Sequence, residues 1–242
     1  MGFAKEVSGM LRDVIGLEVR RLKSISTPAA KLVASLLKFN IDLVLDVGAN
    51  QGQFASEIRR SGYTGNIVSF EPLSKAHSKL LKASYRDAKW DTCPRCALGD
   101  YNGEVEINIA GNSESSSILP MLELHQSAAP ESVYIGKEVV PVKTLDAVAG
   151  QYLKHARTTF LKIDTQGFEW QVLDGACETL PHIKGILVEL SLVPLYGGQH
   201  LWRELIDRLE AEGFILWTFM PVFSDKDSGR TLQVDGVFYR NS

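Results

Sequence analysis

Residues 42–52 read DLVLDVGANQG, an apolar run that ends in a turn with two glycines. The apolar run predicts a buried strand, and glycines at its end predict backbone that lies close to a ligand. In an open, mostly parallel sheet, ligands bind at the carboxyl ends of the strands, where the strand order reverses. This turn is therefore the first place to look for a binding site.

Strand and helix patterns alternate along most of the chain. Four strands that are each followed by a helix are predicted at residues 42–47, 66–71, 158–165 and 185–191, and a short strand is predicted within residues 89–99, before the third of these. This alternation is typical of a parallel sheet with helices on both faces. The last two strands, 214–220 and 232–240, have only a loop between them, so they form an antiparallel hairpin. The sequence thus predicts a doubly wound, Rossmann-like, mostly parallel seven-stranded sheet that ends in an antiparallel hairpin, as in class I methyltransferases.

Two segments lie outside this alternation. Residues 1–39 carry two helical patterns, of which the second begins at Thr27 and Pro28, and we interpret them as a helical extension before a domain at 40–242. The first pattern is amphipathic with a basic end, and three alternatives stay open: packing on the domain, a homodimer contact, or contact with a membrane surface. Residues 111–136 form a long irregular stretch, which we interpret as a lid and substrate-binding insertion.

Composition limits the class of protein. With 242 residues, 45% hydrophobic and 23% charged, the chain is typical of a folded protein with one large core. Its net charge of −3 argues against a nucleic-acid partner. No run reaches the ~20 apolar residues of a membrane span, and the N-terminus lacks a signal-peptide pattern. We expect a cytoplasmic protein, with peripheral attachment to the inner face of the membrane as the alternative. We interpret the CPRC motif at 93–96 as two reduced cysteines without a metal.

The turn itself discriminates among three ligands. A P-loop would end in Gly-Lys-Ser/Thr, and a dinucleotide turn would have a glycine where Asn50 stands. Asp46 would repel a pyrophosphate but attract the ammonium and sulfonium groups of S-adenosylmethionine. Glu71, at the end of the next strand, can bind ribose hydroxyls. We therefore predict S-adenosylmethionine as the cofactor. An NAD-dependent oxidoreductase or epimerase and a non-catalytic cofactor-binding protein are the alternatives.

Several motifs in a fixed order resemble the FkbM family of S-adenosylmethionine-dependent methyltransferases. They are VLDVGANQGQF (44–54), SFEP (69–72), CALGDYNGEVEINI (96–109), FLKIDTQGFEWQVLDGA (160–176) and LVELSLVPLYGGQ (187–199). The resemblance covers roughly residues 40–240. It implies O-methylation of a sugar hydroxyl, on a glycosylated small molecule or a glycolipid. The chain looks nearest to actinobacterial relatives that methylate deoxyhexoses such as rhamnose or fucose.

The catalytic candidates lie at the ends of the fourth and fifth strands. A sugar hydroxyl is a weak nucleophile, so a general base should assist it. Asp164 is the leading candidate, Glu189 and His200 are further catalytic candidates, and His125 competes for the role of base. We interpret Lys162 as structural. The predicted cofactor-binding residues are Asp46, Gly48, Asn50, Gly52, Gln53, Glu71, Pro72, Leu98 and Asp164.

The residues expected to bind the acceptor lie in the insertion and in the two turns that follow the fourth and fifth strands. The predicted substrate-binding residues are Ser117, His125, Gln166, Glu169 and Tyr196. Glu169 has an alternative role as a first-turn carboxylate that complements the helix dipole. Magnesium stays an open alternative, because Asp164, Glu189 and Asp235 supply oxygen atoms, but no metal site is predicted.

Overall fold

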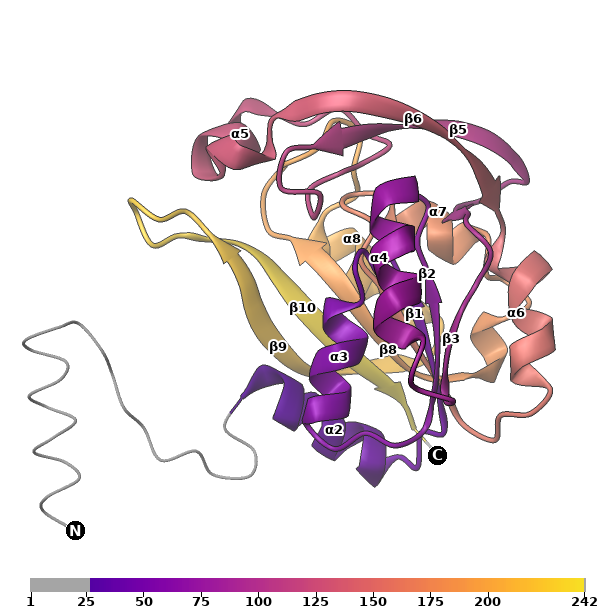
Figure 1. Cartoon of the computed structure of the whole chain (residues 1–242). Coiled ribbons are helices and arrows are strands. Elements are labelled where there is room, and N and C mark those ends of the chain that lie inside the picture. Colours follow the sequence, from indigo (N-terminus) through magenta and orange to yellow (C-terminus); the bar gives the residue numbers. More distant parts are fainter. Residues whose placement is uncertain (1–26, 242) are drawn as a thin grey trace, which may run out of the picture.

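The computed structural model describes residues 27–241, so the first predicted helix lies outside the described residues. A seven-stranded sheet forms the centre of the domain, in the order β3-β2-β1-β7-β8-β10-β9 (Figure 1). Its strands are β1 (Leu43–Val47), β2 (Asn66–Phe70), β3 (Trp90–Thr92), β7 (Thr159–Ile163), β8 (Ile183–Ser191), β9 (Phe214–Ser224) and β10 (Thr231–Arg240). Neighbours from β3 to β8 are parallel, whereas β10 is antiparallel to both β8 and β9. The predicted parallel sheet with a terminal hairpin is confirmed.

Helices cover both faces of this sheet because its inner strands bury side chains alternately on each face. Along β1, Val44 packs in a cluster with Leu36 and Ile58, whereas Leu45 packs in a second cluster with Leu145 and Leu205. The first cluster holds α2 (Pro28–Lys38), α3 (Gln53–Arg60) and α4 (Ser74–Ser84). The second holds α6 (Leu145–Leu153), α7 (Glu169–Asp174) and α8 (Trp202–Ala211).

Helix α2 begins where the sequence predicts it. The Thr27 hydroxyl accepts a hydrogen bond from the Ala30 amide at 3.1 Å, and Pro28 occupies the first turn. The apolar side of α2 joins the same core as α3 and β1. This helix, assigned above to the N-terminal extension, is thus packed on the sheet.

A second, three-stranded sheet lies over the carboxyl edge of the first (Figure 1). It consists of β4 (Ala97–Leu98), β5 (Gly103–Ala110) and β6 (Tyr134–Lys143), with β5 antiparallel to β6. The chain between β5 and β6 contains α5 (Glu123–Ala128) and a short 3-10 turn, η1 (Pro130–Ser132). The segment 111–136 is therefore partly helical and ends inside β6. Nowhere in residues 27–241 does a helix have the length and apolar character needed to cross a membrane.

Candidate active site

A cavity of about 550 Å³ opens at the carboxyl ends of β1, β2, β7 and β8, and the segment between β5 and β6 forms one of its walls. This volume is in the range of small-molecule sites, roughly 300–1,000 Å³. The predicted site residues that line it are Gly48, Asn50, Gln53, Glu71, Pro72, Leu98, Ser117, His125, Asp164, Gln166 and Glu189. The predicted site residues that do not line it are Asp46, Gly52, Glu169, Tyr196 and His200.

The turn after β1 lies directly against the end of β7. Gly48 has a φ of +73°, and a Cβ atom there would lie 1.8 Å from the carbonyl oxygen of Asp164. Only glycine fits this approach between the turn and the end of β7. Gly52 has a different role: it precedes α3 with a φ of +87°, and a Cβ there would lie 2.8 Å from the Trp90 ring. Gly52 therefore serves packing rather than ligand contact.

Glu71 connects the end of β2 to the turn. Its Oε2 accepts a hydrogen bond from the Asn50 amide at 2.8 Å, and its Oε1 accepts one from the Leu73 amide at 2.8 Å. Burial raises the pKa of this carboxyl to about 7, although both amide bonds favour the charged form. The carboxyl is thus fixed at the cavity wall with lone pairs left for further donors.

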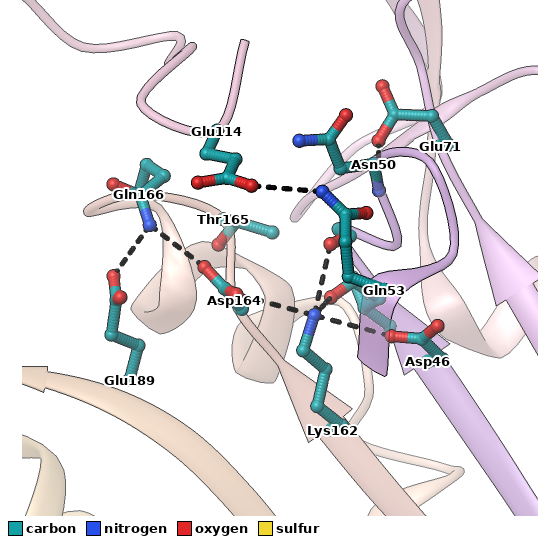
Figure 2. Close-up of polar contacts among 12 residues, drawn as sticks. Asp46, Asn50, Gln53, Glu71, Glu114, Lys162, Asp164, Thr165, Gln166 and Glu189 are labelled. Carbon is teal, nitrogen blue, oxygen red and sulfur yellow. Dashed lines mark hydrogen bonds and ion pairs between the residues drawn. The ribbon is translucent and has the colours of Figure 1, made fainter. Parts of the chain in front are cut away.

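Asp46 does not face the cavity, which corrects the prediction that it attracts the cofactor directly. Its carboxylate is fully buried, accepts a hydrogen bond from Ser69 Oγ at 2.9 Å, and lies 3.3 Å from the Nζ atom of Lys162. Lys162 lines the cavity and also lies 3.4 Å from Asp164 Oδ2 (Figure 2). Strand residues i and i+2 share a face, so Lys162, interpreted above as structural, points the same way as Asp164.

Three side chains form a network at the ends of β7 and β8. The Nε2 atom of Gln166 donates to Asp164 Oδ1 at 2.9 Å and to Glu189 Oε2 at 2.8 Å (Figure 2). Gln233 Nε2 donates to the same Glu189 oxygen at 2.8 Å. Burial raises the pKa of Glu189 well above its usual value, and Asp164 and Glu169 raise it further. The Asp164 side chain, by contrast, is 35% exposed, so this carboxylate is the one open to a ligand.

The backbone of Gln166 is held from the opposite side of the cavity. Its φ of +56° is in the left-handed region, which costs energy for a residue other than glycine. The hydroxyl of Ser117, in the β5–β6 segment, donates to the Gln166 carbonyl at 2.7 Å. The buried Tyr196 hydroxyl donates to Gln166 Oε1 at 2.7 Å. Tyr196 therefore contacts the network from outside the cavity, and its ring is not placed to bind the substrate as predicted.

The two histidines proposed as bases differ in position. His125 is 3% exposed, lines the cavity, and lies beside the Tyr196 ring at 5.1 Å. Its Nδ1 atom is buried and has no hydrogen-bond partner among residues 27–241. Burial lowers the pKa of His125 to about 4, so its ring is neutral at pH 7. His200 stacks on Trp170 and lies 3.1 Å from Glu204 at the start of α8, outside the cavity.

Glu169 supports the turn rather than the acceptor. Its Oε1 accepts hydrogen bonds from the Thr165 amide at 2.9 Å and the Gly167 amide at 3.1 Å. It is the first residue of α7 and is 3% exposed. The alternative of a first-turn carboxylate agrees with this position, since such a residue satisfies free amides at a helix start.

The β5–β6 segment touches the cofactor turn directly. Gln53 Nε2 donates to Glu114 Oε1 at 3.0 Å, and the Ser113 hydroxyl lies 3.4 Å from the side chain of Asn50 (Figure 2 shows the first contact). The sequence indicated a lid here but not these contacts. Within the described residues, no group of three or more His, Cys, Asp or Glu side chains is placed to hold a metal ion.

The sequence comparison identifies the family. The family profile described as "Methyltransferase FkbM domain" matches residues 46–216. This chain belongs to the FkbM methyltransferase family. S-adenosylmethionine is its cofactor, and the alternative of an NAD-dependent enzyme is set aside. A comparison with curated proteins finds no match.

Several solved structures of methyltransferases are similar to this chain. The methyltransferase domain of bacterial CtHen1 is 10% identical with a TM-score of 0.50, over 91% of this chain and 100% of that one. Sp1610 of Streptococcus pneumoniae, solved in complex with S-adenosyl-L-methionine, is 11% identical with a TM-score of 0.49, over 88% and 72%. Precorrin-6y C5,15-methyltransferase from Geobacter metallireducens GS-15 is 12% identical with a TM-score of 0.47, over 93% and 94%. The first of these supports the class I methyltransferase fold.

Proposed function

We propose that this methyltransferase transfers the methyl group to a hydroxyl of a sugar, and that Asp164 accepts the hydroxyl proton. The observation that carries the proposal is the position of Asp164. Its carboxylate is partly exposed at the carboxyl end of β7, while Gln166 holds one oxygen and Lys162 neighbours the other. A fixed, charged carboxylate beside the cofactor turn is what a general base for a weak nucleophile requires.

The cofactor would lie along the turn after β1. The Glu71 carboxylate, held by two backbone amides, would accept the ribose hydroxyls. Pro72 and Leu98 line the same wall and would contact the adenine ring. The bound cofactor supplies a methyl group on a positively charged sulfur. The carboxylate of Asp164 favours this charge because it faces the cavity from the strand next to the turn.

The transfer balances without a further reactant. A bond forms between the acceptor oxygen and the methyl carbon as the bond between that carbon and sulfur breaks, and the electron pair stays on sulfur. Asp164 takes the hydroxyl proton, either before the bond between oxygen and the methyl carbon forms or while it forms. Gln166 keeps the carboxylate from turning away, because its amide donates to Asp164 and Glu189 together. Holding the reacting groups in line supplies much of the rate.

Polar groups on the other side of the cavity suit a polyhydroxylated acceptor. His125, Gln233 and Glu189 line this part and offer both donors and acceptors of hydrogen bonds. The Phe223 ring also lines it, and the faces of sugar rings pack well on aromatic rings. We propose a deoxyhexose on a glycolipid or glycosylated metabolite. A glycolipid acceptor would suit a protein that works at the inner face of the membrane, alone or as a homodimer.

The test is incubation of the purified protein with labelled S-adenosylmethionine and a glycolipid extract, followed by mass spectrometry of the labelled product. A gain of one methyl group on a sugar hydroxyl supports the proposal. Label on a nitrogen or carbon atom contradicts it. Asp164→Asn should lose at least about 100-fold in turnover and much less in cofactor affinity, as expected for a general base. Asp207→Asn, on the exposed side of α8, is the matched control.

A further inference from the structure

The ammonium group of Lys162 occupies the junction between the cofactor turn and the catalytic carboxylate. Its Nζ atom lies 3.0 Å from the Gly48 carbonyl oxygen and 3.2 Å from that of Val47. It also lies 3.3 Å from Asp46 Oδ1 and 3.4 Å from Asp164 Oδ2 (Figure 2). The ammonium donates to the two backbone carbonyls, and the two carboxylates lie at ion-pair distance from it. The lysine side chain is only 5% exposed.

This position follows from the strand register. Asp46 in β1 is paired with Lys162 in β7 and with Ser69 in β2, so the three side chains form a row across parallel strands. Trp90 Nε1 donates to Ser69 Oγ at 2.9 Å, and Ser69 donates to Asp46. Of the three residues in this row, only Lys162 lines the cavity. Asp164 lies two residues further along β7 and therefore on the same face as Lys162. A buried chain of contacts thus connects the sheet to the catalytic carboxylate.

The charges around Lys162 come from every neighbouring element of the site. The carboxyl groups that act on Lys162 are Asp46 on β1, Glu71 at the end of β2, Asp164 at the end of β7 and Asp235 on β10, while Glu169 on α7 and Glu189 on β8 interact with Asp164. Lys226 is the other cation that lines the cavity among the described residues, and it lies in the exposed loop between β9 and β10. Lys162 is thus the buried cation of a strongly acidic site. Burial alone would lower its pKa, but Asp164 and Asp46 outweigh burial and raise it, so the ammonium stays charged.

We propose that Lys162 is a positioning residue for methyl transfer, which fixes Asp164 as a charged carboxylate against the turn that holds the cofactor. Lys162 neighbours Oδ2 of Asp164, and Gln166 donates to Oδ1, so the carboxylate has one orientation. The same ammonium binds the carbonyl groups of Val47 and Gly48. One cation therefore contacts both the turn after β1 and the proposed base.

A purely structural role for Lys162 would be to neutralise buried Asp46. The structural role and the positioning role differ in their effect on the pH dependence of cofactor binding. If Lys162 only neutralises Asp46, its removal lowers the unfolding temperature and leaves the pH dependence of the site unchanged. If it also keeps Asp164 charged, binding of a cationic cofactor becomes sensitive to acid, because Asp164 then faces Glu189, Glu169 and Asp235 without a compensating cation.

The proposal rests on the role of Asp164 proposed above, but its test needs only the cofactor. Calorimetry would measure the affinity for S-adenosylmethionine between pH 5 and 8.5. For Lys162→Met we expect the loss of affinity at acid pH to begin about 1–3 pH units higher than in the wild type, the usual effect of a neighbouring charge on a carboxyl. Lys162→Arg keeps the charge and should stay within about half a unit. In an Asp164→Asn background, Lys162→Met should cause a clearly smaller shift, because only its effect on Glu71 and Asp235 then remains.

Several controls keep the outcomes separate. Asp42→Asn removes an acceptor of the Arg157 and Thr158 amides at the amino end of β1, and should lower stability without moving the pH profile. If Lys162→Met does not fold, Asp46→Asn combined with Lys162→Met removes the unpaired carboxylate and serves instead. A wild-type pH profile in the folded variant, or a shift of the same size with and without Asp164→Asn, overturns the proposal. Cofactor binding without methylation of any sugar would contradict only the proposed function.

Discussion

The Tyr196 hydroxyl lies 2.7 Å from Oε1 of Gln166, and this contact sets the direction of the Gln166 amide. The two ends of an amide differ, because the oxygen only accepts and the nitrogen only donates. With Oε1 bound to Tyr196, Nε2 must face Asp164 and Glu189. A buried tyrosine outside the cavity thus decides which hydrogen bonds the Asp164 carboxylate receives.

Removing the Tyr196 hydroxyl should therefore reduce turnover more than binding. Tyr196→Phe frees the amide to rotate and leaves Oε1 unpaired, a loss of about 1 kcal/mol, so kcat should fall roughly 5- to 10-fold. The affinity for S-adenosylmethionine should stay within about twofold of the wild type. Tyr134→Phe is the matched control, because the Tyr134 hydroxyl donates to the Leu119 carbonyl at 2.8 Å and does not touch the network. Equal loss of kcat in both variants would contradict this role.

Glu71 should contribute to binding of the cofactor rather than to binding of the acceptor. Each of its oxygens accepts a backbone amide, from Asn50 and Leu73. In Glu71→Gln one oxygen becomes an NH₂ group that faces another N–H donor, so one hydrogen bond is lost and the turn shifts. We expect affinity for S-adenosylmethionine to fall about 10- to 100-fold, by calorimetry. Glu57→Gln, on the exposed side of α3, should change nothing. Wild-type affinity in Glu71→Gln would remove this residue from the cofactor site.

The central sheet was predictable because each of its parts has a local signal. The apolar run and the glycine turn indicate β1, and the short connection between the last two strands indicates the hairpin. The three-stranded sheet was not predicted as such. Most of β6 is exposed or partly exposed, and it contains Gly136 and Pro141, so it shows no clear alternation of apolar side chains.

The site was predictable where it depends on strand ends. Asp164 follows β7 and Glu189 lies near the end of β8, the neighbouring parallel strand, so their carboxyl ends meet at one edge and both residues line the cavity. Residues beyond the strand ends were not predictable in this way. His200 stands nine residues after β8, and the path of that loop depends on tertiary contacts such as the stacking on Trp170. Asp46 was misplaced because a strand residue faces either the ligand or the sheet interior, and proximity in sequence does not decide between them.

The contact between Gln53 and Glu114 should slow release of the cofactor. It joins the cofactor turn to the β5–β6 segment at 3.0 Å, on the exposed side of the cavity. A single exposed hydrogen bond contributes about 0.5–1 kcal/mol, so Glu114→Ala should raise the dissociation rate of S-adenosylmethionine about two- to fivefold. Stopped-flow fluorescence would measure this rate. Glu104→Ala, an exposed position on β5, is the control, and an unchanged rate in Glu114→Ala would exclude a lid at this contact.

Asp235 should reduce the stability of the protein at neutral pH. It lies directly opposite Glu189 in the antiparallel pair of β10 and β8, so both carboxyl groups are on one face of the sheet. Burial and the charge of Asp164 together raise the pKa of Asp235 to about 7, although Lys162 lowers it. Between about pH 4 and 7 the folded state therefore binds more protons than the unfolded state, and the free energy of unfolding falls as pH rises.

Asp235→Asn removes this charge and keeps the shape of the side chain. We expect the variant to be more stable than the wild type at pH 8, by about 2 kcal/mol, with a smaller gain at pH 5, where the folded wild type is protonated. For a domain of this size that corresponds to a rise of roughly 4–8 °C in Tm at pH 8. Thermal unfolding at both pH values would measure it, with Asp207→Asn as a control that should show no pH-dependent difference. A variant less stable than the wild type at pH 8 would mean that charged Asp235 contributes a favourable interaction, and that Lys162 compensates it fully.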